Sequence, residues 1–402
     1  MERPCLRLDD PPSYSHFLHT YLLPNQPLII GSSLIASWPA YNLWRRAGNQ
    51  TKWEHLKDVY GDLEVTVADC ATREFSDQRR DQRLFRDVVS LWEAGEGQSL
   101  YIKDWHLART LTSKNPAHDM FYTTPEVFRD DWMNAYYSAH TEDDFRFVYV
   151  GAAGTFTPLH RDVYTSYSWS TNVCGHKRWW LFPPEQTHLL FRKGGEEHME
   201  TAYDVRDVDP SKYPFPSGWY HQVENLTDCI SINHNWCNAV NLPSLYASMC
   251  AKVLEVEHAL EDVRELLSQG AVQSADLDLE AWKQEWVSIV QDVVEKDAGW
   301  KYVHVCQTVR CRSTMLTPIT VVSWTTFWRI ILHALRLAMG RPCLVVDTLW
   351  PRTPSELMPS LDFIKTRVRA CYEDFVKRPE SERSLVAGLE EVLVNVKELL
   401  DE

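Results

Sequence analysis

Hydrophobic and polar residues change their spacing twice along this 402-residue chain, which divides it into three regions. In the first region, residues 1–144, short helix-like and strand-like patterns are mixed. Residues 13–23 predict a helix that ends before a proline, residues 28–30 predict a strand that ends before a glycine, and residues 63–67 alternate as a half-buried strand does. We therefore expect a flank of α/β elements here.

The second region, residues 145–242, consists of one predicted strand after another. Residues 145–150 alternate aromatic and β-branched side chains and end before a glycine, and residues 177–182 form an aromatic strand that two prolines end. Short strands punctuated by glycine and proline are typical of a β-barrel or a β-sandwich. We expect this region to be the core of the protein.

The third region, residues 243–402, has the period of amphipathic helices. Apolar residues predict one helix over residues 245–267 that ends at the next glycine, a second over residues 282–293 and a last one over residues 385–400. Residues 301–323 show neither period, and we interpret them as an irregular insertion without an assigned function. The apolar stripes of these helices indicate packing surfaces.

Charge and cysteine content narrow the classes of function. The chain carries 41 Lys and Arg against 56 Asp and Glu, a net charge of −15, which repels a phosphate backbone, so we expect no direct nucleic-acid binding. The ten cysteines include no C-x-x-C pair, which indicates reduced intracellular thiols. The N-terminus has no apolar signal core, and the longest uncharged stretch, residues 313–328, is too short to cross a bilayer. We expect a cytoplasmic or nuclear protein, or one found in both places, without membrane contact.

Three His-x-Asp/Glu triplets are candidates for two of the protein ligands of a ferrous ion. They are His140/Glu142, His160/Asp162 and His198/Glu200. On a strand, residues i and i+2 point to the same face, so a histidine and a carboxylate with this spacing form two legs of a facial triad. Since about two such triplets are expected by chance from this composition, the triplet alone does not identify a site. An ordinary surface or core role is far more common for any one of them.

The surroundings favour His160. It follows a strand bounded by glycine and precedes Lys177, which begins the aromatic strand. A lysine on such a strand is otherwise an ordinary surface residue, but inside a barrel its ammonium would pair with an anion such as a dicarboxylate co-substrate. His221, at the start of a strand after a Pro-Ser-Gly turn, is the candidate third ligand. His234 is its rival, but apolar residues two positions away on both sides indicate a core histidine.

Several of these stretches together resemble a JmjC domain, which belongs to the cupin-type Fe(II)/2-oxoglutarate oxygenases. The resemblance covers roughly residues 15–300, and the motifs that carry it are residues 157–162, 172–184 and 215–235. Further motifs, residues 101–107, 168–175 and 231–242, are similar to the jumonji-domain-containing protein 4 subgroup of this family. Members of that subgroup hydroxylate a lysine of the eukaryotic peptide-chain release factor.

The resemblance implies an α+β fold built on a double-stranded β-helix, the cupin or jelly-roll barrel, with N-terminal α/β elements and a C-terminal helical region. It implies Fe(II) as cofactor, with 2-oxoglutarate and O₂ as co-substrates. His160, Asp162 and His221 match the iron ligands. Lys177 matches the residue that pairs with the distal carboxylate of 2-oxoglutarate. Positions that commonly lie near this co-substrate are matched by Thr157, Ser170 and Asn233.

The implied function is hydroxylation of a protein substrate, namely a lysine of a translation release factor, and hence a role in translation termination. A JmjC histone-lysine demethylase is an alternative, because hydroxylases and demethylases share these ligands, although no zinc-binding Cys/His cluster or basic tail accompanies the motifs. A third hypothesis is a non-catalytic JmjC-like scaffold that binds a partner protein.

The interval between Asp162 and His221 departs from the family pattern. It holds 58 residues, fewer than members of the family usually have, with three prolines within residues 210–216. Proline cannot donate a hydrogen bond to a sheet ladder, so this stretch cannot supply a central strand. We expect one barrel strand to be missing: either coding sequence for it is omitted, or the barrel is gapped and His221 is displaced.

Overall fold

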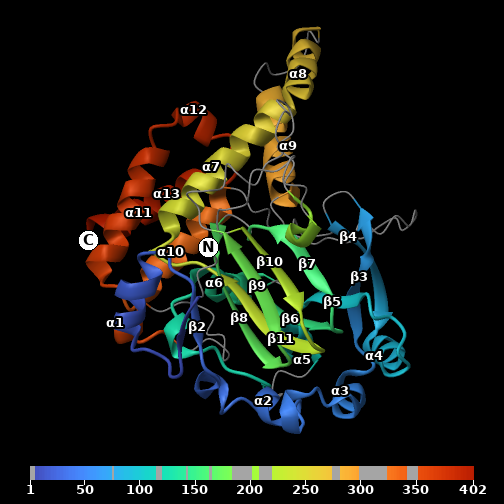
Figure 1. Ribbon diagram of the computed structural model, residues 1–402. Helices are drawn as coiled ribbons and strands as arrows, with labels where there is room; N and C mark the ends of the chain where they lie inside the picture. Colours follow the sequence, from blue (N-terminus) through green and yellow to red (C-terminus); the bar gives the residue numbers. More distant parts are fainter. Residues whose placement is uncertain are drawn as a thin grey trace.

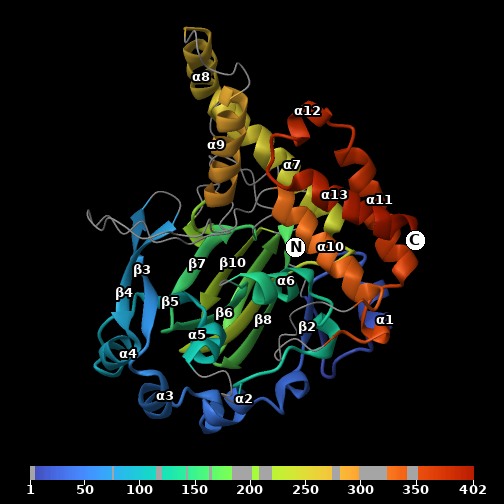
Figure 2. The same ribbon diagram turned by 180° about the vertical axis from the view of Figure 1, so that it is seen from behind.

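Two antiparallel β-sheets lie face to face at the centre of the molecule, and helices surround them (Figure 1, Figure 2). The structure is a computed structural model that describes residues 5–74, 77–114, 120–141, 144–162, 165–182, 202–207, 220–273, 281–297, 324–341 and 352–402. The long helix α7 (Leu242–Ala259) passes beside one end of the sheets, and α8 (Glu261–Gln273) and α9 (Ala281–Asp297) extend away from them.

The larger sheet has six strands in the order β4-β3-β5-β6-β11-β8. Their bounds are β3 Glu64–Glu74, β4 Asp77–Leu84, β5 Leu100–Trp105, β6 Arg146–Gly151, β8 Tyr167–Cys174 and β11 Cys229–Trp236. The first three come from the N-terminal flank, and β5 pairs with β6 of the barrel region. The flank and the barrel therefore share one continuous sheet.

The smaller sheet has three strands in the order β7-β10-β9. Their bounds are β7 Phe156–His160, β9 Lys177–Phe182 and β10 Tyr220–Asn225, and a separate parallel pair joins β1 Leu6–Leu8 to β2 Leu28–Ile30. Strands β6 to β11, divided between two facing sheets, form the jelly-roll barrel that we predicted. Within the described residues, β8 and β9 each pair with a strand on one side only. We expected a strand to be missing between Asp162 and His221, and most of that interval, residues 183–201 and 208–219, lies outside the described residues.

The N-terminal helices cover the outer face of the larger sheet and form one apolar core with it. They are α1 Tyr14–Phe17 with a π-helical turn Leu18–Leu22, α2 Pro39–Leu43, α3 Trp53–Tyr60, α4 Phe85–Glu93 and α5 Leu107–Lys114. Short 3₁₀ turns are Ser32–Ile35, Ala47–Asn49, Glu126–Phe128, Val205–Asp207 and Ser355–Leu357. The helix and the two strands predicted for the flank are confirmed.

A second apolar core holds the C-terminal helices together. They are α7, α9, α10 Trp324–Ala338, α11 Leu361–Phe375 and α13 Leu389–Asp401, with the short α12 Glu380–Arg383 beside them. Helix α6 (Trp132–His140), which precedes the barrel in sequence, also belongs to this core, because Tyr136 contacts His333 of α10. No described helix is both long and apolar enough to span a membrane.

Two boundaries differ from the helical prediction. The helix predicted over residues 245–267 is two helices, α7 and α8, which meet at Leu260. The apolar period continues across this break, so the pattern does not reveal it, and α8 runs through Gly270 rather than ending there. The last predicted helix is confirmed as α13, and the insertion predicted at residues 301–323 lies outside the described residues.

Side chains of β11 alternate between the two faces of the larger sheet. Ile230 and Ile232 are 1% exposed and lie in the outer apolar core, whereas Ser231 contacts Lys177 of the opposite sheet. Since successive residues of a strand point to opposite faces, Asn233 lies on the same side as Ser231. The space between the two sheets is thus lined by polar side chains.

Candidate metal centre

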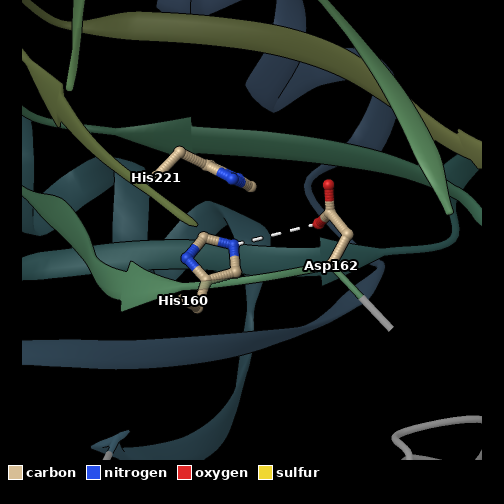
Figure 3. Close-up of side chains that lie close together, drawn as sticks. All are labelled: His160, Asp162 and His221. Atoms are coloured by element: carbon tan, nitrogen blue, oxygen red, sulfur yellow. Dashed lines mark ion pairs between the residues drawn. The ribbon is translucent and has the colours of Figure 1, made fainter. Parts of the chain in front are cut away.

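Three side chains, His160, Asp162 and His221, meet inside the barrel (Figure 3). One ligand atom from each lies within 4.8 Å of the others. The Nε2 atom of His160 is 4.0 Å from Oδ1 of Asp162, and the two imidazole centroids are 4.2 Å apart. Among the described residues this is the single group of three or more His, Cys, Asp or Glu that could hold a metal ion. The three predicted ligands are therefore brought together, and His221 is not displaced from the other two.

Strands β7 and β10 place these ligands. The two strands pair antiparallel with His160 opposite His221, so the two imidazoles start from neighbouring positions of one sheet. Strand β7 ends at His160, and Asp162 therefore comes from the loop that follows. The i, i+2 relation that we predicted for a regular strand is wrong at its second position, yet the carboxylate still reaches the imidazoles because the chain has only begun to leave the sheet.

A β-bulge in β7 turns Thr157 toward the same side as His160. Thr157 lies opposite Val223 and His160 lies opposite His221, so β7 has one more residue than β10 in this interval. Residues three apart in a regular strand point to opposite faces of the sheet. The extra residue of a bulge brings their side chains to the same face. The co-substrate position that we predicted at Thr157 thus depends on the bulge.

The two ring nitrogens of His160 have different partners. Nδ1 lies 2.8 Å from the carbonyl oxygen of Pro158, which can only accept, so Nδ1 carries the proton and donates it. Nε2 then holds the lone pair that binds a metal. Burial and the nearby His221 lower the pKa of His160 to about 4, so the ring is neutral at pH 7. His160 is thus prepared as a ligand.

Strand β9, which pairs with β10 on the side away from β7, holds His221 in place. Its side chain is buried, and its ring stacks on Trp179 of β9 with centroids 5.5 Å apart and an interplanar angle of 28°. A stacked ring cannot rotate freely without losing this contact. Trp179 therefore fixes the plane of the second imidazole.

Lys177 is half-buried, and its ammonium lies between the two sheets. Its Nζ donates to Ser231 Oγ at 2.6 Å and to the hydroxyl of Tyr101 at 3.3 Å, and it lies 5.6 Å from the ring centroid of Tyr149. No described carboxylate forms an ion pair with it, and burial lowers its pKa. Because a buried charge without a counter-ion is costly, an anionic ligand group would be stabilised here.

The other predicted co-substrate residues lie on the same inner surface. Thr157 lies on the same side of its sheet as His160 because of the bulge in β7. Ser170 of β8 lies opposite Asn233 of β11, and its hydroxyl is 3.0 Å from Oδ1 of the asparagine. The structure therefore places all three inside the barrel, in two separate groups.

The remaining histidine candidates have ordinary structural roles. His234 is 0% exposed, with the hydroxyl of Tyr122 2.7 Å from its Nε2 and the ring of Trp169 4.1 Å away, which confirms the core histidine that we predicted. His140 stacks on Tyr136 at 4.6 Å in the α6–α10 contact. Its partner Glu142 and the whole triplet at residues 198–200 lie outside the described residues.

Tyr101, Tyr149 and Ser231 are the neighbours of Lys177 that sequence reasoning missed. Tyr101 belongs to a motif that carried the resemblance, but no spacing relates it to Lys177. The sequence feature that could have indicated Ser231 is the alternation in β11, where Ser231 and Asn233 alternate with apolar residues. Such alternation gives the face of a side chain and not its partner on another strand.

A family model described as a cupin-like domain matches residues 14–215, half of the chain, and ends before His221. The chain belongs to the cupin-like family. Three relatives of this cupin-like chain carry names that concern the JmjC domain or its chemistry. The JmjC resemblance is therefore confirmed.

These relatives come from a mammal, a plant and a fungus. The chain is 36% identical over 280 residues to "2-oxoglutarate and iron-dependent oxygenase JMJD4" of Mus musculus, covering 62% of this chain and 64% of the relative. It is 37% identical over 293 residues to "Arginine-specific demethylase JMJ20" of Arabidopsis thaliana, covering 63% and 61%. It is 30% identical over 402 residues to "JmjC domain-containing protein 1" of Schizosaccharomyces pombe, covering 86% and 78%. The chain thus spans just under two thirds of the length of the first two relatives.

The donor set of this cupin-like barrel fits a ferrous ion. Two imidazoles and one carboxylate are the ligands of a facial triad, which leaves further coordination positions for a chelating co-substrate and O₂. The lone pair on Nε2 of His160 and the ammonium of Lys177 without a counter-ion are the observations that fit iron and a dicarboxylate. His160, Asp162 and His221 would hold the metal, and Lys177 would meet the distal carboxylate.

Proposed function

We propose that this chain is an Fe(II)- and 2-oxoglutarate-dependent oxygenase that hydroxylates a protein side chain. The observation that carries the proposal is the convergence of His160, Asp162 and His221 in the same barrel interior as the ammonium of Lys177. The name of the mouse relative, an iron-dependent oxygenase that uses 2-oxoglutarate, supports this chemistry.

When bound, ferrous iron with 2-oxoglutarate activates O₂, so that one oxygen atom enters a substrate C–H bond and the other enters succinate, with loss of CO₂. The chain contributes orientation. The Pro158 carbonyl fixes the tautomer and ring of His160, and Trp179 fixes the ring of His221. Lys177, with Tyr101 beside it, binds and orients the distal carboxylate.

We further propose that the substrate is a lysine of a peptide-chain release factor, which would place the protein in translation termination. This substrate rests on the motifs shared with the jumonji-domain-containing protein 4 subgroup, residues 101–107, 168–175 and 231–242. The first of these motifs supplies Tyr101 and the last supplies Ser231, both of which contact Lys177.

The test combines binding, turnover and product analysis. The full chain is titrated calorimetrically with Mn(II) as an iron surrogate and then with 2-oxoglutarate. Succinate formation is measured with Fe(II), and a purified release factor is analysed by mass spectrometry for one added oxygen on a lysine. We expect binding, turnover and the modified lysine in the wild type and none of the three in His160→Ala or Asp162→Ala. A folded wild-type chain that binds neither metal nor 2-oxoglutarate would refute the oxygenase and favour a scaffold.

A demethylase is the second candidate, and the name of the Arabidopsis relative favours it. Demethylation uses the same ligands, because a hydroxylated N-methyl group releases formaldehyde without further catalytic residues. Methylated histone peptides, with methyl-lysine in one set and methyl-arginine in another, distinguish the two reactions. Release of formaldehyde from these peptides, with an unmodified release factor, would identify a demethylase.

A further inference from the structure

Asp104, near the end of β5, has an unusual backbone conformation close to Lys177. Its φ angle is 53°, in the left-handed region that residues other than glycine rarely adopt. The pairing of β5 with β6 shifts register between Ile102 and Trp105, so Asp104 lies within a bulge. Such strain persists only where the surroundings enforce it, and it is frequent at functional sites.

Both carboxylate oxygens of Asp104 accept hydrogen bonds. Oδ1 accepts from the hydroxyl of Tyr149 at 2.7 Å, and Oδ2 accepts from Nη1 of Arg80 at 2.6 Å. Arg80 also donates to Asp77 at 2.8 Å, and Asp77 is 38% exposed. A chain of charge-assisted hydrogen bonds therefore runs from the edge strand β4 to Tyr149 inside the barrel.

Tyr149 connects this chain to Lys177. Its ring centroid lies 5.6 Å from Nζ of Lys177 and 6.1 Å from the ring of Tyr101. An ammonium near the face of a tyrosine ring is attracted to it, and both of these side chains are half-buried. Because Asp104 holds the hydroxyl at the far end of the ring, the ring cannot turn away from the ammonium without breaking a partly buried, charge-assisted hydrogen bond.

We propose that Asp104 is a positioning residue for the co-substrate: it fixes Tyr149, and Tyr149 keeps the ammonium of Lys177 in the orientation that binds the distal carboxylate of 2-oxoglutarate. The inference rests on the proposed function. Asp104 acts at a distance, because its own oxygens are taken up by Tyr149 and Arg80. The bulge in β5 provides the backbone conformation in which its carboxylate reaches Tyr149.

The test is the affinity for 2-oxoglutarate, measured by calorimetry on the full chain saturated with Mn(II). Tyr149→Phe keeps the ring and removes its hydroxyl, and we expect the Kd for 2-oxoglutarate to rise roughly three- to tenfold, the worth of one typical hydrogen bond. Asp104→Ala should raise it to a similar extent. Asp104→Asn keeps an oxygen acceptor and tolerates the left-handed conformation, so it should restore most of the affinity.

The double variant Tyr149→Phe/Asp104→Ala separates this mechanism from two independent effects. If Asp104 acts through Tyr149, the double variant should bind no more weakly than Asp104→Ala alone, because the second change removes an interaction that is already lost. Additive losses would refute the connection. If Asp104→Ala does not fold, the nearly isosteric Tyr149→Phe decides, and an unchanged Kd there overturns the inference.

Tyr246→Phe is the matched control. It removes a tyrosine hydroxyl that donates to Asp374 at 3.0 Å in the helical region, so it should change stability without changing the Kd for 2-oxoglutarate. Urea denaturation of every variant identifies a general loss of stability. A wild-type chain that fails to bind 2-oxoglutarate overturns the proposed function together with this inference. If the wild type binds 2-oxoglutarate and Tyr149→Phe binds it with the same Kd, the inference alone is overturned.

Discussion

Replacing Lys177 with methionine should change the stability of the fold and the affinity for 2-oxoglutarate in opposite directions. Methionine is about as long as lysine and carries no charge, so it fits the same space between the sheets. Burial lowers the pKa of Lys177, which means that the folded state disfavours the charged form that must meet the co-substrate. A residue kept for binding at the expense of stability is expected at a functional site.

The magnitude follows from the contacts of the ammonium. Burying an unpaired ion costs several kcal/mol, which the hydrogen bonds to Ser231 and Tyr101 and the nearby rings offset in part. The variant leaves the fully buried hydroxyl of Ser231 without this partner, at a cost of about 1–3 kcal/mol. We therefore expect the free energy of unfolding of the metal-free chain to rise by about 1 kcal/mol.

Binding should weaken far more than stability rises. Removing one member of a buried charge pair costs about 2–5 kcal/mol, so the Kd for 2-oxoglutarate should rise at least about thirtyfold. The stability gain should also depend on pH. Because the pKa is lowered in the folded state, the wild type gains stability as the pH rises toward about 10, the pKa of an unfolded lysine, and the advantage of the variant should shrink there.

Urea denaturation at several pH values and calorimetry with Mn(II) and 2-oxoglutarate measure the two effects. The control is Lys377→Met, whose side chain is 74% exposed and which should change neither quantity appreciably. If Lys177→Met lost stability and kept its affinity, the ammonium would be an ordinary structural donor to Ser231, and its assignment to the co-substrate would be refuted.

Three further predictions concern the metal site and one buried acid, Asp130. His160→Ala should abolish Mn(II) binding in calorimetry and His140→Ala should not, since only the first belongs to the ligand cluster; retained binding in His160→Ala would place the metal elsewhere. Mn(II) at a hundred times its Kd should raise the unfolding free energy of the wild type by about 2.7 kcal/mol in urea denaturation and leave His221→Ala unchanged, and equal shifts in both would argue against His221 as a ligand. Burial raises the pKa of Asp130 to about 7, so the stability of the wild type relative to Asp130→Asn should be greatest below about pH 4 and fall by up to about 4 kcal/mol as the pH rises to 7; a difference independent of pH would contradict this.

Much of the fold could be predicted from local patterns, and long-range pairing could not. The aromatic strand predicted over residues 177–182 coincides with β9, and the alternation in residues 145–150 lies one position from β6. That β5 pairs with β6 could not be read from either strand, because the pairing of two strands depends on tertiary contacts. The six-stranded sheet therefore appears only in the structure.

The three metal ligands were predictable because residue type, spacing and the family resemblance all indicated the same positions. The surroundings of Lys177 were not, since they depend on irregularities of two strands. The bulge in β7 turns Thr157 inward, and the bulge in β5 brings Asp104 to Tyr149. A bulge inserts one residue into a ladder and changes the face of every residue beyond it, and no local signal in either stretch predicts this.

The polar interior of the barrel determines where the stability of the fold must come from. A centre that holds a metal and a dicarboxylate needs hydroxyls, imidazoles and an ammonium between its sheets, so the two inner faces cannot form an ordinary apolar core. The apolar side chains of the larger sheet, such as Ile230, Ile232 and Trp236, instead lie on its outer face, where the N-terminal helices bury them. Burying such a side chain contributes about 1.5–3 kcal/mol, and residues 145–242 alone would expose this face to water. The flank is therefore part of the folding unit of the barrel, because the site inside requires that hydrophobic burial take place outside.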